Sequence, residues 1–323
     1  MSGVSAALHV FADTAFWMAA IAIATPLMFA ALGGLLCGQA GMLNLGIEGI
    51  FTAGSLTALL CAHAGRGHWT ALLLAACIGA LIGILSGTLT SPLRLPQRTS
   101  GFAVSLLVVG LCQLIYGLSF ATTAALLQIV PFTSIDLSWT SRLPYAPFIS
   151  EIPFLSDFGR ALFHATPPVY LVLVLMLVVS FVINRTPLGL ALSTCGENPT
   201  AIAAQGRSVH GLRVGAMTIG SALIAIGGGV LVLTNLGAFS FALVSGRGFA
   251  ALVLAMIAGW RVGRTFFFVL AFAMVDTYQM HLQQTLGDPL ALTLSPVLPY
   301  VIALAVLVTT SRSMMRRFAL SAE

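Results

Sequence analysis

Lysine is absent from the 323 residues of this chain, and charged residues of all kinds make up only 7% of it. A phosphate-binding loop of the GxxxxGK type requires a lysine, so the chain is not expected to hydrolyse ATP itself. Soluble domains contain about 25% charged residues, whereas hydrophobic residues here reach 59%. A soluble globular class is excluded, because no such fold could bury so much apolar surface.

Cysteine is also scarce and carries no recognisable pattern. The five cysteines have no CxxC spacing and mostly lie inside apolar runs. They are read as free thiols within helices, and a disulfide framework or metal site is not expected. No Ser/His/Asp set stands out among so few ionisable residues, so no catalytic residue, metal or resident cofactor is predicted.

What the sequence has is a series of apolar windows close to the ~20 residues that a membrane-spanning helix needs. We therefore expect an all-α, polytopic bundle of about nine transmembrane helices, within a range of eight to ten. Ile47 to Cys61 and Phe249 to Trp260 are short for a full crossing, and whether they are broken or re-entrant helices stays open. The expected spans are Ala15 to Leu36, Ile47 to Cys61, Trp69 to Leu89, Phe102 to Phe120, Pro168 to Asn184, Val214 to Thr234, Phe249 to Trp260, Thr265 to Leu282 and Pro296 to Thr310.

The arginines predict which ends of these helices face the cytoplasm, because short cytoplasmic loops retain positive charge. Ten of the 14 cations fall in alternate loops, and four remain for the opposite side. The formal charge of +5 is therefore explained by membrane orientation, and no nucleic-acid partner is expected. The ten are Arg94, Arg98, Arg185, Arg207, Arg213, Arg261, Arg264, Arg312, Arg316 and Arg317, and the four are Arg66, Arg142, Arg160 and Arg247.

Two longer polar segments interrupt what we expect to be a single transmembrane domain covering residues 1–323. Residues 128–166 contain four prolines and several aromatics, and the arginine topology places them outside the cytoplasm. That segment is either a docking surface for a soluble partner or a plain interfacial loop. Residues 185–213 are placed in the cytoplasm.

The cytoplasmic segment contains a predicted short helix. Pro187 is expected to end the preceding helix and Gly196 to Pro199 to form a turn. Asn198 then serves as N-cap, Pro199 as the first helical residue, and Gly206 as the stop. Such an element is either a lever between two spans or an ordinary interhelical loop.

A third polar segment, Gly38 to Gly54, lies within the apolar part of the chain and reads GQAGMLNLGIEGIFTAG. It places Gln39, Asn44 and Glu48 at a depth where a charge costs about 2.5–3.5 kcal/mol. The four-residue spacing of Asn44 and Glu48 predicts one shared helix face. These side chains are expected to line a path or to join helices, with Glu48 either a gating residue or a structural hydrogen-bond partner.

A similar polar stripe occurs farther along the chain. Asp276, Gln279 and Gln283 recur at helical spacing, and such a stripe faces a bundle interior. It either lines a path or fastens two helices together. Gly79, Gly83 and Gly87, at four-residue steps, predict close helix packing.

Three groups of motifs together resemble the permease subunits of ABC importers of the branched-chain amino acid and simple-sugar superfamily, and most closely the nucleoside branch. The first is the run CGQAGMLNLGIEGIFTAG. The second, in the cytoplasmic segment, comprises Gly189, Gly196, Glu197, Asn198, Pro199, Ala201 and Gly206. The third comprises Gly246-Arg247-Gly248-Phe249, Ala258-Gly259-Trp260 and Leu298-Pro299-Tyr300, so the resemblance extends from about Ala24 to Thr310.

The resemblance implies an inner-membrane bacterial permease with the type II importer architecture. It would work with a cytoplasmic ABC ATPase that binds ATP, a second and distinct permease subunit, and an extracytoplasmic substrate-binding lipoprotein. The second motif group would dock on the ATPase, although Ser193-Thr194-Cys195 stands where relatives usually carry an arginine. Gln39, Asn44 and Glu48, with Asp276 and Gln279, would lie on or beside the translocation path for nucleosides.

Other interpretations stay open at this point. The cargo of an ABC permease of this kind can also be a simple sugar or a branched-chain amino acid. An ion-coupled secondary transporter could use Glu48 and Asp276, but it would not need a coupling helix. A channel would need a filter-like motif, and none is visible.

Overall fold

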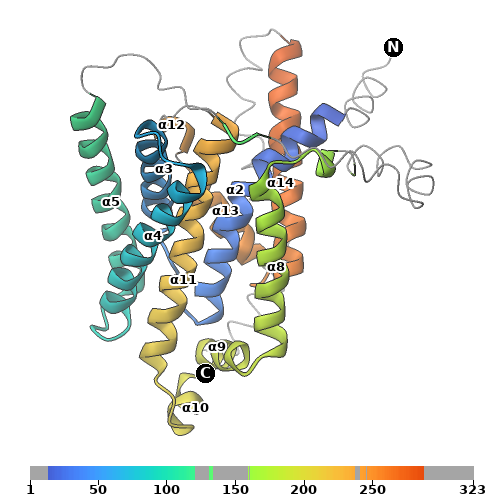
Figure 1. Cartoon of the computed structure of the whole chain (residues 1–323). Helices are drawn as coiled ribbons and strands as arrows, with labels where there is room; N and C mark the ends of the chain where they lie inside the picture. The colour runs from blue at the N-terminus through green and yellow to red at the C-terminus, as the bar shows by residue number, and fades with distance from the viewer. Residues whose placement is uncertain are drawn as a thin grey trace.

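The computed structural model describes residues 14–120, 131–133, 159, 161–236, 241–244 and 246–286, and every regular element in these ranges is a helix (Figure 1). The expected all-α class is confirmed for this part of the chain. The predicted span Pro296 to Thr310, and most of the predicted loop 128–166, lie outside the described residues.

Five described helices are long and apolar enough to cross a membrane, so the expectation of about nine spans is not confirmed. They are α2 (Thr14–Gln39), α4 (His68–Thr90), α5 (Gln97–Phe120), α8 (Pro167–Arg185) and α11 (Val209–Val230) with its π-helical continuation η2 (Leu231–Leu236).

Two of the expected spans are short, as their sequences predicted. Helix α3 (Ile47–His63) has 17 residues and α13 (Arg247–Ile257) has 11. At 1.5 Å per residue, α13 covers about 16 Å, roughly half of a bilayer core. The last described helix, α14 (Val262–Leu286), is 25 residues long but more polar, and a four-residue helix, α12 (Phe241–Val244), precedes α13.

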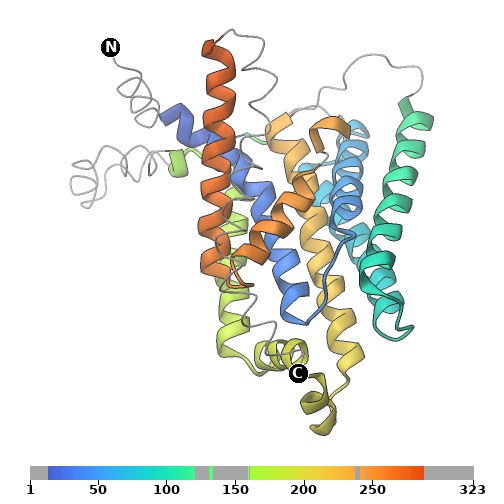
Figure 2. The same ribbon diagram turned by 180° about the vertical axis from the view of Figure 1, so that it is seen from behind.

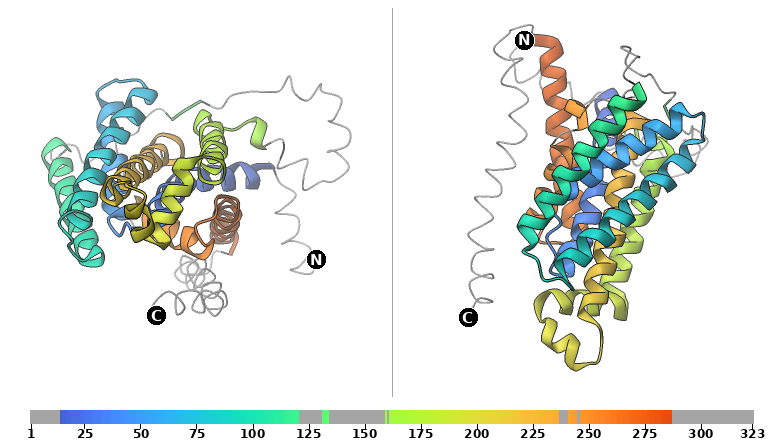
Figure 3. Two further views of the ribbon diagram at one scale, coloured as in Figure 1. Left: turned by 90° about the horizontal axis from the view of Figure 1, so that it is seen from below. Right: turned by 90° about the vertical axis from the view of Figure 1, so that its left-hand side faces the viewer.

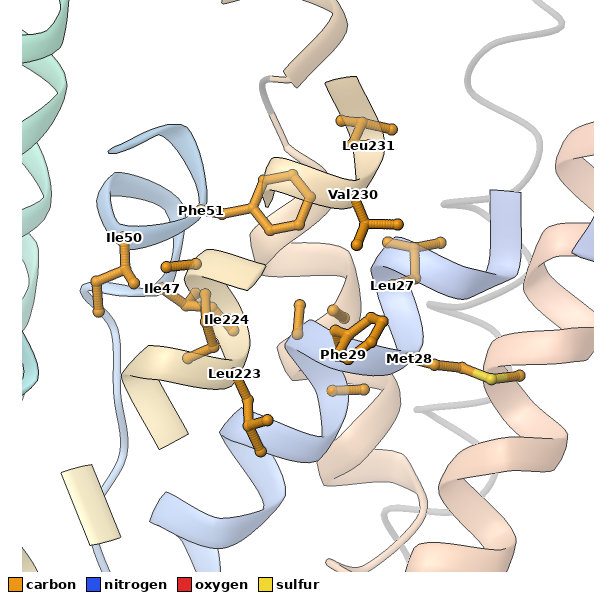
Figure 4. Close-up of a cluster of buried hydrophobic side chains, with 14 of the residues drawn as sticks. Leu27, Met28, Phe29, Ile47, Ile50, Phe51, Leu223, Ile224, Val230 and Leu231 are labelled. Carbon is orange, nitrogen blue, oxygen red and sulfur yellow. The ribbon is translucent and has the colours of Figure 1, made fainter. Parts of the chain in front are cut away.

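Helix α11 lies at the centre of the bundle and packs on α2, α3 and α4. Figure 4 shows Leu223 and Ile224 of α11 among Phe29 of α2 and Ile47 and Phe51 of α3. All five side chains are buried. Burial of these side chains and the close fit of their helices hold the four elements together.

The predicted glycine packing is confirmed on α4. A Cβ atom at Gly79 would lie 2.5 Å from the Ser221 carbonyl oxygen of α11, and one at Gly83 would lie 2.6 Å from that of Met217. Both distances are shorter than any ordinary van der Waals contact, so only glycine lets the two backbones approach this far.

Large apolar side chains cover the outside of the bundle. Leu81 of α4, Leu106 of α5 and Leu177 of α8 are more than half exposed. A water-soluble protein rarely exposes contiguous apolar surface on this scale, whereas hydrocarbon tails accommodate it without cost.

The described arginines group as the topology predicted. The connections α4–α5, α8–α11 and α13–α14 all lie toward the lower end of the bundle, where α9 (Pro187–Glu197) and α10 (Pro199–Ala204) project (Figures 1 and 2). Seen from below, α9 and α10 lie across the ends of the long helices (Figure 3). These connections and the helix turns beside them contain Arg94, Arg98, Arg185, Arg207, Arg213, Arg261 and Arg264.

The upper end of the bundle holds the described part of the predicted outer loop. The Phe132 amide donates to the Leu233 carbonyl oxygen at 2.9 Å. The Phe132 ring contacts His68 and Trp69, with centroid separations of 4.6 and 5.6 Å. This short stretch is therefore fastened to α4 and η2 at the end opposite α9 and α10 (Figure 1).

Candidate functional site

The polar segment that follows α2 is an irregular connection between two helices. Gly41 adopts a left-handed conformation with φ of +72°, which ends the helical path after Gln39. The Leu43 amide then donates to the Gln97 side chain of α5 at 3.2 Å, so it does not enter a helical ladder. Helix α3 begins only at Ile47, so the prediction that Asn44 and Glu48 share one helix face is wrong.

Glu48, in the first turn of α3, caps the N-terminus of α13. Its carboxylate accepts the Gly246 amide at 2.6 Å and the Phe249 amide at 3.2 Å, and the side chain is only 8% exposed. The first amides of a helix lack intrahelical partners and carry partial positive charge, so a carboxylate is well placed there. Gly246 has φ of +85°, which turns its N–H toward Glu48.

Gly248 makes this cap sterically possible. A Cβ atom at Gly248 would lie 2.8 Å from Glu48 Oε2 and 3.1 Å from the Glu48 Cα. The second contact is to backbone, so a side chain there could not be accommodated by a rotamer change. Helices α3 and α13 therefore meet at a position where the sequence requires glycine.

Gln39, the last residue of α2, holds the opposite end of α13. Its Nε2 donates to the Trp260 carbonyl oxygen at 2.7 Å, just beyond the last turn of α13. Its Oε1 accepts the Ser193 hydroxyl of α9 at 2.9 Å. One side chain thus joins α2, α9 and the end of α13.

Asn44 connects the same segment to the central helix. Its Nδ2 donates to the Ser221 hydroxyl of α11 at 3.1 Å, and the residue is 1% exposed. The Asn44 Oδ1 is buried and accepts no hydrogen bond. A buried amide oxygen without a donor is costly, which makes it a candidate contact for a polar solute.

A positive charge at the start of α13 acts on the polar stripe of α14. The Asp276 carboxylate is attracted by Arg247 in the first turn of α13, adjacent to the amides that Glu48 caps. Gln279 is 6% exposed, and its Oε1 has no hydrogen-bond donor. The side chain of Gln283 lies outside the described residues.

The cytoplasmic segment forms two consecutive helices where one was expected. Pro187 begins α9 as its first residue, and the Thr186 hydroxyl caps that helix by accepting the Gly189 amide at 3.3 Å. The predicted turn from Gly196 to Pro199 is wrong, because Gly196 and Glu197 complete α9. A proline that cannot continue one helix is well suited to the first turn of the next.

The prediction for the second helix is confirmed. Asn198 Oδ1 accepts the Ala201 amide at 3.2 Å, and Pro199 is the first residue of α10. Gly206 follows with φ of +74°. Glu197 and Asn198 are exposed at the junction of the two helices, where a partner could reach them.

Helix α9 also touches the polar segment through its backbone. A Cβ atom at Gly41 would lie 2.9 Å from the Gly196 Cα, and one at Gly196 would overlap the Gln39 carbonyl oxygen. Beside this contact Cys195 is buried against Ile202, and burial raises the pKa of its thiol although Arg213 opposes the shift. Only glycine fits at positions 41 and 196.

Sequence reasoning missed the residues that complete these contacts. Ser221 and Gln97 are single polar residues with no motif of their own. Ser193 was noted only as part of a departure from the family pattern, and Trp260 only as the end of a span and as part of a resemblance. Each contacts a partner distant in the chain, such as Ser193 and Gln39, which are 154 positions apart. Within the described ranges, no group of three or more His, Cys, Asp or Glu residues could hold a metal ion.

Comparison with known proteins gives several similar chains. The guanosine ABC transporter permease NupQ of Bacillus subtilis is 27% identical over 256 residues, which is 75% of this chain and 74% of that protein. The nucleoside ABC transporter permease NupC of Lactococcus lactis is 26% identical and covers 73% of each chain. A putative glucose ABC transporter permease of Haloferax volcanii, TsgC13, is 28% identical and covers 90% of this chain and 83% of its own.

Among solved structures, a chain of PsaBC from Streptococcus pneumoniae, determined in complex with a Fab, resembles this one with a TM-score of 0.51. The likeness covers 95% of both chains at 14% sequence identity, so it concerns the fold alone. A profile describing the branched-chain amino acid transport system permease component matches residues 17–310. The chain is thus a membrane-embedded member of the family of branched-chain amino acid transport system permease components.

Proposed function

We propose that this chain is the permease subunit of a bacterial ABC importer that carries nucleosides across the inner membrane. The observation that carries the proposal is the direct connection between α9, exposed at the arginine-rich end, and the polar segment inside the bundle. A permease driven by an external ATPase needs such a connection, whereas an ion-coupled transporter does not. The nucleoside class rests on the similarity to NupQ and NupC.

Three partners follow from this proposal. A cytoplasmic ABC ATPase binds and hydrolyses ATP and docks on α9 and α10 at the lower end of the bundle. A second permease subunit, a distinct paralogue, completes the membrane part, and a lipoprotein delivers the nucleoside at the other end. The residues assigned to ATPase docking are Gly189, Gly196, Glu197, Asn198, Pro199, Ala201 and Gly206.

The translocation path is assigned to polar side chains with two different tasks. Gln39 already uses its polar atoms on α13 and α9, and Glu48 uses its carboxylate on α13, so both shape the path by holding α13. Asn44 and Gln279 each retain an unpaired, buried carbonyl oxygen, which can accept a hydrogen bond from a hydroxyl or amine of the solute. Asp276 supplies negative charge beside Arg247.

The test is uptake of labelled nucleosides into proteoliposomes that contain this chain together with the subunits encoded beside it. The expected result is uptake that requires both ATP and the binding lipoprotein. Glucose and leucine serve as competing solutes. ATP-dependent uptake of either one alone would keep the ABC assignment and replace the cargo, whereas uptake that follows an ion gradient and ignores ATP would overturn the assignment.

A further inference from the structure

Helix α13 is hydrogen-bonded at both ends by side chains that belong to one short stretch of the chain. Gln39 bonds the carbonyl oxygen of Trp260 beyond its C-terminal turn, and Glu48 bonds the amides at its N-terminus. The two residues are nine positions apart and lie on either side of the irregular connection. Any shift of that connection therefore moves both ends of α13 together.

The connection is in turn joined to α9. Ser193 donates its hydroxyl to Gln39 Oε1 at 2.9 Å, and the backbones at Gly41 and Gly196 approach too closely for any Cβ atom. At that point the two backbones meet directly, with no side chain between them. A movement of α9 toward the bundle must be transmitted to Gln39.

The Gln39 amide can serve only one arrangement of this network. Its carbonyl oxygen faces a hydroxyl donor and its nitrogen faces a carbonyl acceptor. Reversing the amide would place two oxygens opposite each other at Trp260, which removes a hydrogen bond and adds repulsion. The side chain therefore acts as a directed link, with one atom committed to α9 and the other to α13.

We propose that Gln39 is a positioning residue that transmits movement of α9 to α13 through Ser193 on one side and Trp260 on the other. The proposal rests on the proposed function, because it takes the ATPase as the source of the movement. Helix α13 is expected to move with Gln39, because it is too short to span the membrane and Glu48 holds its N-terminal end. The device couples ATP hydrolysis to a displacement of the half-helix beside the path.

Substitutions can break the link at either bond. Ser193→Ala removes the bond to α9, and Gln39→Glu keeps an acceptor for Ser193 but loses the donor to Trp260. Each is expected to lower the amount of solute moved per ATP hydrolysed by about fivefold to tenfold, as expected for one hydrogen bond. Ser193→Thr retains a hydroxyl and should restore most of the wild-type ratio.

The double variant distinguishes a link from ordinary stabilisation. If the two bonds act in series, Ser193→Ala adds nothing once Gln39→Glu has broken the second bond. Independent structural losses would instead multiply. The matched control is Ser100→Ala at the same end of the bundle, since the Ser100 hydroxyl bonds only carbonyl oxygens of its own turn, those of Pro96 and Gln97.

The experiment measures three quantities on the complete complex in proteoliposomes: ATPase co-purified per permease, ATP hydrolysed, and solute taken up. The expected outcome is normal co-purification with a lowered transport-to-hydrolysis ratio in both single variants and no further loss in the double. The link would be overturned if the single variants had the same transport-to-hydrolysis ratio as Ser100→Ala, or if their losses multiplied in the double variant. Loss of the assembled complex in both single variants would overturn it as well. Failure of the wild-type chain to bind any ATPase would instead refute the proposed function.

Discussion

The carboxylate of Glu48 lies 2.6 Å from the backbone nitrogen of Gly246, although 198 positions separate the two residues in the chain. This contact places an acidic side chain of one short helix over the positive end of another. A charge that would be costly in hydrocarbon is thereby balanced by amides that would otherwise lack partners.

Replacing Glu48 tests how much of the structure depends on this cap. Glu48→Gln keeps one acceptor but loses the charge. We expect it to lower the free energy of unfolding by about 1–2 kcal/mol, which is typical of a weakened helix N-cap. Glu48→Ala leaves the α13 amides unpaired and should cost more. The measurement is the thermal unfolding temperature of the purified protein in detergent, together with nucleoside uptake.

We expect the assembled complex to survive Glu48→Ala with reduced uptake. An Ala variant as heat-resistant as the wild type would show that the carboxylate does not hold α13. Complete failure to insert or assemble would assign Glu48 a purely structural role.

Gly248→Ala is predicted to separate α3 from α13. The new methyl group would meet both the carboxylate and the backbone of Glu48, so the two helices must move apart. Gly263→Ala near the start of α14 is the matched control, because no atom lies within 4 Å of its Cβ position. The thermal unfolding temperature in detergent should be clearly lower for Gly248→Ala and should stay near the wild-type value for Gly263→Ala.

A second glycine pair tests the packing around α11 within one helix. A Cβ atom at Gly220 would lie 2.6 Å from the Gly33 carbonyl oxygen of α2, whereas Gly215 has no neighbour within 4 Å. Gly220→Ala should destabilise the protein, and Gly215→Ala should be neutral or stabilise it by up to about 1 kcal/mol through helix propensity. Equal unfolding temperatures would contradict the close approach of α2 and α11.

Charge reversal at the junction of α9 and α10 tests the docking assignment. Glu197 is exposed there, and Glu197→Lys is expected to lower the amount of ATPase that co-purifies with the permease by several fold. Glu197→Gln, which removes charge without reversing it, should have a smaller effect. Unchanged co-purification and unchanged coupling of hydrolysis to uptake in the Lys variant would move the docking surface elsewhere.

Patterns local to the chain predicted much of this architecture. Hydropathy located the long helices because their side chains meet apolar surroundings along the whole length, either the bundle interior or the membrane. The glycine steps of α4 and the Asn198 cap were predictable since both depend on residues a few positions apart. Pro187 follows the end of α8, as predicted, but the sequence does not reveal that a new helix begins at the same residue.

The contacts of the candidate site depend on neighbours that no spacing reveals. Gln39, Asn44 and Glu48 were recognised as costly polar residues, but their partners lie on α9, α11 and α13. The prediction that Asn44 and Glu48 share one helix face also failed, because Gly41 turns the chain and the Gln97 side chain accepts the Leu43 amide.

The seven arginines that gather at the lower end of the bundle also have a consequence for the chain in an energised cell. With this end in the cytoplasm, as the arginine topology predicts, a membrane potential that is negative inside attracts it, and each elementary charge moved across 100 mV changes the energy by about 2.3 kcal/mol. The seven arginines alone would contribute on the order of 16 kcal/mol to the cost of inverting the chain, and Glu197 at the same end would offset about 2.3 kcal/mol of this. The voltage across the membrane thus acts to keep the protein in one orientation after insertion.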